Sequence, residues 1–254
     1  GDEPEAWGGC GSRPPQPRRG ARVATRFMSD GWSVKRMIRT IVLSRTYQLD
    51  SYAPADTMAA DPDGRWLSHH ARRRLDAESL RDSMLKVSGQ LDLEPGQGSD
   101  IQGMDALVNT AGNLHRPSHP RSAYLCMLRN SPPPELAAFN LPTFESVKSQ
   151  RDVTTLPAHA LFLLNSDFVV EQAEHFATLA LESVANDDKA RVAWMYRRAL
   201  NRDPSPAEQS GALKLVESVD ADLFQQQDAT KRRLKAWATL GQALLVTNEF
   251  RYVD

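Results

Sequence analysis

The sequence predicts a mainly α protein, an irregular helical domain with at most a short strand or hairpin. Three observations predict this class. Apolar residues recur at helical spacing in several segments, and capping residues or prolines mark where those segments begin. Only one short segment, 122–130 (SAYLCMLRN), has the apolar composition of a strand. We find no convincing internal repeat.

The first part of the chain contains two predicted helices separated by a loop. Ser33 is the expected N-cap of the first helix, and Asp76 and Gly89 are expected to begin and end the second. Residues 51–66, rich in Pro, Asp and Ala, form the loop between them. In the first helix, apolar residues share one face: Val34, Met37, Ile38, Ile41 and Val42. Residues 92–122 then form a long connection without clear periodicity.

The segment 151–171 (RDVTTLPAHALFLLNSDFVVE) carries the most consistent local signals. Pro157 suits the first turn of a short apolar helix, and Ser166 can cap a second helix with Asp167 at its positive end. Because the first helix lacks a polar stripe, we expect it to be buried, with the other helices packed around it.

The last part of the chain is predicted to be helical almost throughout. Ser205, Pro206 and Glu208 form an expected capping box. The predicted helices cover a short proline-initiated segment within 131–142 and residues 167–184, 188–200, 206–219 and 230–247. Four tryptophans are expected to pack in the core: Trp32, Trp66, Trp194 and Trp237.

The composition is that of an ordinary globular protein. Its 254 residues include 31 basic and 32 acidic side chains, so no overall field attracts nucleic acid or anionic lipid. No apolar run approaches the roughly 20 residues of a membrane span. The first residues lack a signal-peptide pattern, so we expect either a cytoplasmic chain or a piece of a longer secreted protein. The two cysteines form no disulfide framework, and no CxxCH motif attaches haem.

Six segments occur in an order that resembles one family. They are GWSVKRMIRTIVLSRTYQLDS, RRRLDAESLRDSMLKVSGQLD, RNSPPPELAAFNLP, RDVTTLPAHALFLLNSDFVVEQA, WMYRRALNRDPSPAE and LGQALLVTNEFRYVD. Over residues 24–254 the chain resembles the planctomycete-type C-terminal domain of unknown function. The resemblance implies a large exported parent protein with a cytochrome-c-like domain and a second domain of unknown function. It therefore implies a periplasmic or cell-surface setting and haem c only in a neighbouring domain, with no cofactor in this chain. It implies no reaction.

Residues 1–23 differ from the domain predicted over residues 24–254. They are rich in Pro, Gly and Arg with few aliphatic residues, which predicts a disordered tail. A second interpretation is an out-of-frame tail. One codon choice for residues 16–23, read one nucleotide later, encodes SPDEELEW, like the acidic helix that the family has here. Either interpretation predicts an uncovered apolar surface on the helix of residues 32–47.

The histidines do not predict a metal site. His115 and His119 are four residues apart, but prolines between and after them oppose the helix that would present both on one face. The other four are adjacent in sequence or belong to different helices: His69, His70, His159 and His175. The chain also lacks the GxSxG, GxGxxG and Walker motifs of hydrolases and nucleotide-binding proteins.

Charged residues in the shared segments form the candidate site. Guanidinium groups can bind a carboxylate, sulfate or sugar acid, whereas Glu135 and Asp152 could act as acid and base or form internal salt bridges with the arginines. The candidate residues are Arg73, Arg74, Asp76, Arg129, Glu135, Arg151 and Asp152.

Two functions follow from these observations. The first is a non-catalytic helical C-terminal module that docks the haem domain or holds an assembly together at the cell surface. The alternative is a domain that binds or hydrolyses anionic polysaccharide, so the sequence leaves open whether the protein is an enzyme.

Overall fold

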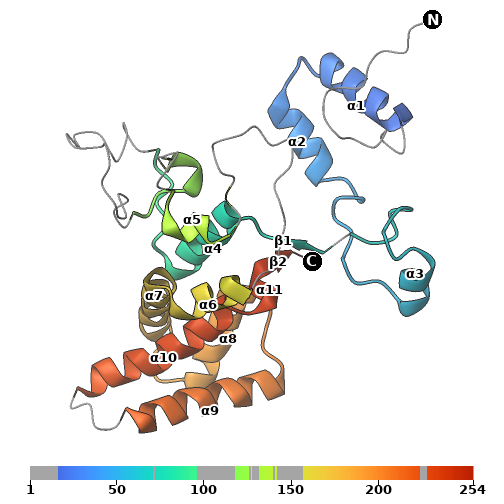
Figure 1. Cartoon of the computed structure of the whole chain (residues 1–254). Coiled ribbons are helices and arrows are strands. Elements are labelled where there is room, and N and C mark those ends of the chain that lie inside the picture. Colours follow the sequence, from blue (N-terminus) through green and yellow to red (C-terminus); the bar gives the residue numbers. More distant parts are fainter. Residues whose placement is uncertain are drawn as a thin grey trace, which may run out of the picture. The chain divides into compact units, whose positions relative to one another are not determined.

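The computed structural model describes residues 17–70, 72–95, 118–125, 127, 132–139, 141, 157–223 and 228–253. The fold is mainly α-helical, as predicted, and the strands within these residues form one two-stranded sheet, β1 with β2 (Figure 1). The sequence predicts one domain over 24–254, whereas the chain divides into two compact units, residues 1–73 and residues 74–253. Such a division depends on contacts between distant segments, which local periodicity does not record.

Unit 1 contains three helices: α1 (Pro17–Ser29), α2 (Val34–Val42) and α3 (Ala55–Ala60). α1 begins at Pro17, within the segment 1–23 that the sequence predicts to be a disordered or out-of-frame tail. Proline is favourable in a first helical turn, and the arginines and alanines that follow are good helix formers. Phe27 of α1 then packs edge-on against Trp32, with 5.3 Å between the ring centroids.

The cap of α2 is confirmed, because the Ser33 side chain accepts a hydrogen bond from the backbone N–H of Arg36. None of the nine residues of α2, all of them described, is buried. Trp32 is 64% exposed, which corrects its predicted place in the core. Within unit 1, the apolar surface around α2 is therefore uncovered, as predicted, although a helix precedes it.

The boundary between the units falls within β1 (Arg73–Arg74), and the first helix of unit 2 is α4 (Ala77–Ser88). Both predicted ends of α4 are confirmed: the Asp76 side chain accepts from Ser79 N–H at 2.7 Å, and Gly89 adopts a left-handed conformation with φ of 78°. The strand predicted over residues 122–130 begins instead as a 3-10 helix, η1 (Ser122–Tyr124). The short helix α5 (Pro134–Ala137) starts at a proline, as predicted.

Helices α6 (Pro157–Asn165) and α7 (Asp167–Ser183) follow the prediction closely in their bounds. Ser166 has the extended backbone of an N-cap, but its side chain makes no capping hydrogen bond. The expectation that α6 is buried and central is wrong. Leu163 is 1% exposed, yet Leu164 is 54% exposed. An apolar composition all round the helix therefore does not place it in the centre of the fold.

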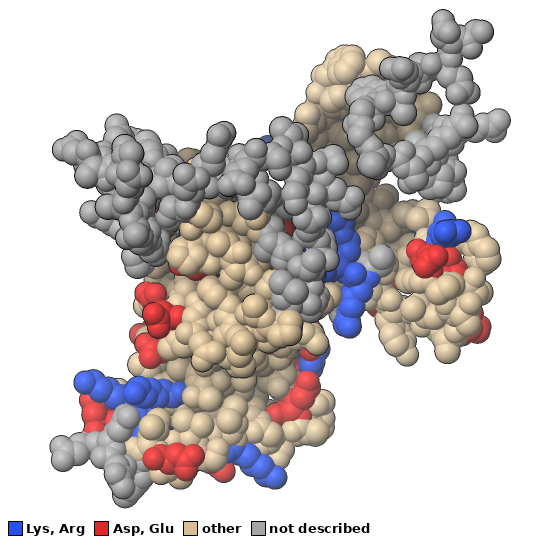
Figure 2. Space-filling model, viewed as in Figure 1, with Lys and Arg blue, Asp and Glu red and all other residues tan. Residues whose placement is uncertain are grey.

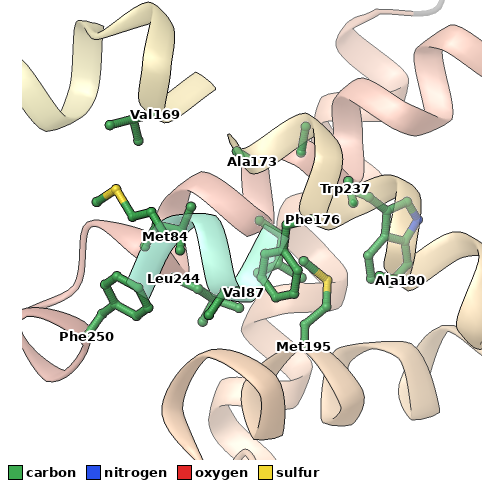
Figure 3. Close-up of a cluster of buried hydrophobic side chains, with 14 of the residues drawn as sticks. Met84, Val87, Val169, Ala173, Phe176, Ala180, Met195, Trp237, Leu244 and Phe250 are labelled. Carbon is green, nitrogen blue, oxygen red and sulfur yellow. The ribbon is translucent and has the colours of Figure 1, made fainter. Parts of the chain in front are cut away.

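The remaining helices are α8 (Asp188–Leu200), α9 (Pro206–Asp222), α10 (Ala229–Leu245) and α11 (Asn248–Arg251), followed by β2 (Tyr252–Val253). The capping box at the start of α9 is confirmed in both directions. The most extensive helix packing joins α10 to α7, and α4 also packs on α7. Figure 3 shows Phe176 of α7 and Met195 of α8 side by side within this core. The centre of unit 2 is thus the α7–α10 pair, and Trp237 is buried there as predicted.

Candidate functional site

The predicted site residues are only partly located by the structure. Arg73 and Arg74 lie in β1, and Asp76 immediately follows as the cap of α4. Glu135 lies on α5, half-buried. Three further residues lie outside the described part of the chain: Arg129, Arg151 and Asp152.

Arg74 contacts a buried histidine from a distant segment. Its Nη1 lies 3.3 Å from Nδ1 of His159 on α6. Since a guanidinium group can only donate, Nδ1 is the acceptor and His159 is neutral. Burial lowers the pKa of His159, and the charges of Arg74 and Arg251 lower it further. The pair therefore joins β1 to α6 around a histidine that resists protonation.

Arg81 is a buried cation that the sequence analysis overlooks. It is 5% exposed, and its guanidinium donates to the carbonyl oxygens of Ser118 at 2.6 Å and Pro120 at 2.9 Å. Burial lowers the pKa of Arg81, while the charges of Glu135 and Asp82 raise it. Its position among the core-facing residues of α4 was the available signal, because a helical period places residue 81 on the face that carries Leu80 and Met84.

Asp82, the residue after Arg81 on α4, also binds the segment 118–122. Both the backbone N–H and the hydroxyl of Ser122 donate to Asp82 Oδ1, each at 2.7 Å. Together Arg81 and Asp82 bind segment 118–122 to α4. Glu135 lies close enough to Arg81 for its charge to raise the pKa of that arginine.

A second arginine links two helix ends. Arg202 donates to both oxygens of Glu249 at 2.5 and 2.8 Å and to both oxygens of Glu208 at 2.6 and 2.9 Å. These bonds, with those from Ser205, lower the pKa of Glu208 to about 2. Figure 2 likewise shows acidic and basic side chains next to one another over α9 and α10. Internal ion pairing accounts for the charges of Arg202, Glu208 and Glu249.

Unit 1 contains a cleft of about 670 Å³ that none of the predicted site residues lines. Its wall is a loop that folds around the buried carboxylate of Asp61, which accepts from Arg65 N–H at 2.7 Å, Trp66 N–H at 2.9 Å and the Ser68 hydroxyl at 2.8 Å. Burial raises the pKa of Asp61, but these hydrogen bonds outweigh it and hold the pKa below its ordinary value. The loop is therefore anchored by an ionised carboxylate.

A family model described as PSD1, protein of unknown function (DUF1553), matches residues 2–216. The chain belongs to the PSD1 family. The match includes residues 2–22, for which the sequence analysis finds no counterpart in the family, and ends before α10. No curated protein matches the chain, and no solved structure does.

Two further findings bear on the chemistry of this PSD1 chain. Among its described residues, no group of three or more His, Cys, Asp or Glu side chains could hold a metal ion. No helix in the same part of the chain is long and apolar enough to cross a membrane. Three features of the described residues are thus candidates for a function: the buried Arg81 of unit 2, the cleft of unit 1 and the exposed apolar face of α2.

Proposed function

We propose that this PSD1-family chain is a non-catalytic docking module that binds a neighbouring domain of its parent protein through α2. The observation that carries the proposal is the exposure of the apolar face of that helix. Val34, Ile38 and Ile41 are 63%, 55% and 43% exposed. They are spaced four and three residues apart, so they form one stripe, which is the arrangement of a helix that inserts into a partner's groove.

The charge around this stripe narrows the choice of partner. Between residues 20 and 48 there is one acidic side chain, Asp30, against six basic ones: Arg22, Arg26, Lys35, Arg36, Arg39 and Arg45. The chain as a whole has a net charge of −1, so this basic character is local. A partner surface that is apolar at its centre and acidic at its rim would complement it.

The resemblance suggests which domain supplies that surface. Cytochrome-c-like domains accompany this kind of module in large exported proteins, so we take the partner to be the haem-bearing domain of the parent, in the periplasm or at the cell surface. In this proposal the haem belongs to the partner and no cofactor is held here. The module positions its neighbour and carries out no reaction.

The alternative, an anionic-polysaccharide-binding or hydrolytic site at the predicted residues, has less support. Asp76 is used as a helix cap, Arg74 contacts His159, and Glu135 lies near Arg81. Each of these three side chains has a structural role within the protein. Side chains used in this way have fewer polar atoms with which to bind a ligand.

Titration of the chain with the parent's separately purified haem-bearing domain tests the proposal. Calorimetry should show saturable binding with a negative heat-capacity change, which marks the burial of apolar surface. Ile38→Asp should weaken binding by at least about tenfold, because it places a charge in the centre of the stripe. Leu164→Asp, an equally exposed position on α6 of unit 2, is the matched control and should not change the affinity. No binding, or equal effects of both variants, would refute docking through α2.

A further inference from the structure

We infer that the cleft of unit 1 is a binding site for an uncharged oligosaccharide. Its volume of about 670 Å³ lies within the range of roughly 300–1,000 Å³ typical of small-ligand sites. The chemical class of the ligand depends on the polar and aromatic side chains that line the cleft: Asp50, Tyr52, Asp63, His69, His70 and Arg72. This inference concerns a surface other than the α2 stripe and is independent of the docking proposal.

The backbone holds the two sides of the cleft together at Asp50. The carbonyl oxygen of Asp50 accepts from His70 N–H at 2.9 Å, and its Oδ1 accepts from Tyr52 N–H at 2.9 Å. Residues 50–52 are therefore fixed against residues 69–70. The Asp61-anchored loop supplies the rest of the wall, so the cleft is shaped before any ligand arrives.

One histidine of the lining has a fixed orientation. The Ser68 hydroxyl donates to Asp61 and lies 3.0 Å from Nδ1 of His69. Since the hydroxyl proton is already used, Nδ1–H of His69 is the donor in that contact, which fixes the orientation of the ring. His69 and His70 line the same cleft, although they are adjacent in sequence.

The lining fits a sugar better than the other small-ligand classes. Carboxylates accept hydrogen bonds from hydroxyl groups, while arginine donates them, and a polyhydroxylated ligand uses both. The ring of Tyr52 is 85% exposed and offers an apolar face on which a pyranose ring can stack. The lining holds two carboxylates and one guanidinium group, and Arg65 pairs with Asp63 at 3.6 Å. The charge is therefore nearly balanced, without the cluster of cations that a nucleotide or another strong anion needs.

The balance of the lining charge also bears on the choice among glycans. Sulfated or uronic-acid chains would gain no net electrostatic attraction here, whereas neutral chains need none. The cleft therefore implies a ligand different from the anionic polysaccharide suggested by the arginine-rich segments.

The inference is tested by measuring the binding of defined neutral hexasaccharides, built from glucose, mannose or xylose in different linkages, to the intact chain by ligand-observed NMR and calorimetry. We expect at least one to bind at millimolar concentration or below. Tyr52→Ala should lower that affinity by about tenfold or more, and Tyr52→Phe should retain it, because stacking needs only the ring. Trp66→Ala is the matched control, since Trp66 is an equally exposed aromatic residue of the same unit that does not line the cleft.

Any one of three results would overturn the inference. The first is that the neutral glycans fail to bind at millimolar concentration, and the second is that only sulfated and uronic-acid glycans bind. The third is that Tyr52→Ala and Trp66→Ala affect binding equally. Because Tyr52 is so exposed, its variants should keep the wild-type circular dichroism spectrum, so that a loss of affinity reports on the ligand contact.

Discussion

Gly241 of α10 lies so close to Ala173 of α7 that a methyl group at position 241 would lie 3.2 Å from the carbonyl oxygen of Ala173 and 3.3 Å from Cδ1 of Phe176. This close approach lets the two helices pack more extensively than any other pair of helices among the described residues. The core of unit 2 therefore depends on the absence of a side chain at one position.

Gly241→Ala should destabilise the protein. In an exposed helix interior a glycine-to-alanine change normally stabilises by about 0.5–1 kcal/mol. At position 241 the added methyl group would force the backbone carbonyl of Ala173 to move. Overpacking of this kind lowers the free energy of unfolding by about 1–3 kcal/mol. Gly211→Ala in α9 is the control, because a methyl group there meets nothing within 4 Å. Chemical denaturation should show opposite signs for the two variants, and a stabilised Gly241→Ala would show that α7 and α10 are less closely packed.

Leu163→Ala and Leu164→Ala should differ strongly although the residues are neighbours on α6. Leu163 is buried in the core, and its truncation should lower the free energy of unfolding by about 2–5 kcal/mol. Leu164 is largely exposed, so its truncation should change that free energy by less than about 0.5 kcal/mol. Equal losses in equilibrium denaturation would mean that the exposed side of α6 is covered in solution.

His159 should make stability depend on pH. Its pKa is lowered in the folded protein by burial and by Arg74 and Arg251, whereas an unfolded histidine titrates near about 6.5. Between these two values the unfolded chain binds more protons. The contribution of His159 to the free energy of unfolding is therefore fully present above pH about 6.5. It is lost as the pH decreases toward the pKa of His159 in the folded protein.

Denaturation curves at several pH values check this effect. His159→Gln should reduce the fall in stability below pH about 6.5. A pH profile of His159→Gln that parallels the wild type would show that His159 does not cause the dependence.

Ser205→Ala should have a modest and local effect. The side chain of Ser205 caps α9 while Glu208 accepts from the backbone N–H of Ser205 at 2.7 Å. Loss of the cap should lower the free energy of unfolding by about 1 kcal/mol with an unchanged circular dichroism spectrum. Ser218→Ala, the same change within α9, should cost less than about 0.5 kcal/mol. Identical values for the two variants would refute the capping role.

Local chemistry was well predicted from the sequence. The caps at Ser33, Asp76 and Ser205 lie where side-chain oxygens meet unpaired backbone N–H groups, and this interaction needs only residues three positions apart. Helix bounds beyond residue 157 were accurate for the same reason, with α8 predicted at its observed ends.

Features that depend on distant contacts were not predicted. The hydrophobicity of α6 suggested a central helix, whereas the small residues Ala173 and Gly241 let α7 and α10 pack more closely. The pairing of Arg74 with His159 spans 85 positions of the chain, and the bonds of Arg81 to residues 118 and 120 span 37 and 39. The cleft of unit 1 arises from a loop whose shape depends on Asp61, which no motif marked.

Hydrogen exchange at the backbone amides of α2 tests the docking proposal most directly. The exchange rates are measured by mass spectrometry for the chain alone and for the intact parent protein under the same conditions. Amides exchange slowly when a helix is covered and stabilised by packing. The proposal predicts that peptides covering residues 34–42 exchange at least about tenfold more slowly in the parent, while peptides from α9 are unchanged. Equal exchange of residues 34–42 in both proteins would show that no neighbouring domain covers α2.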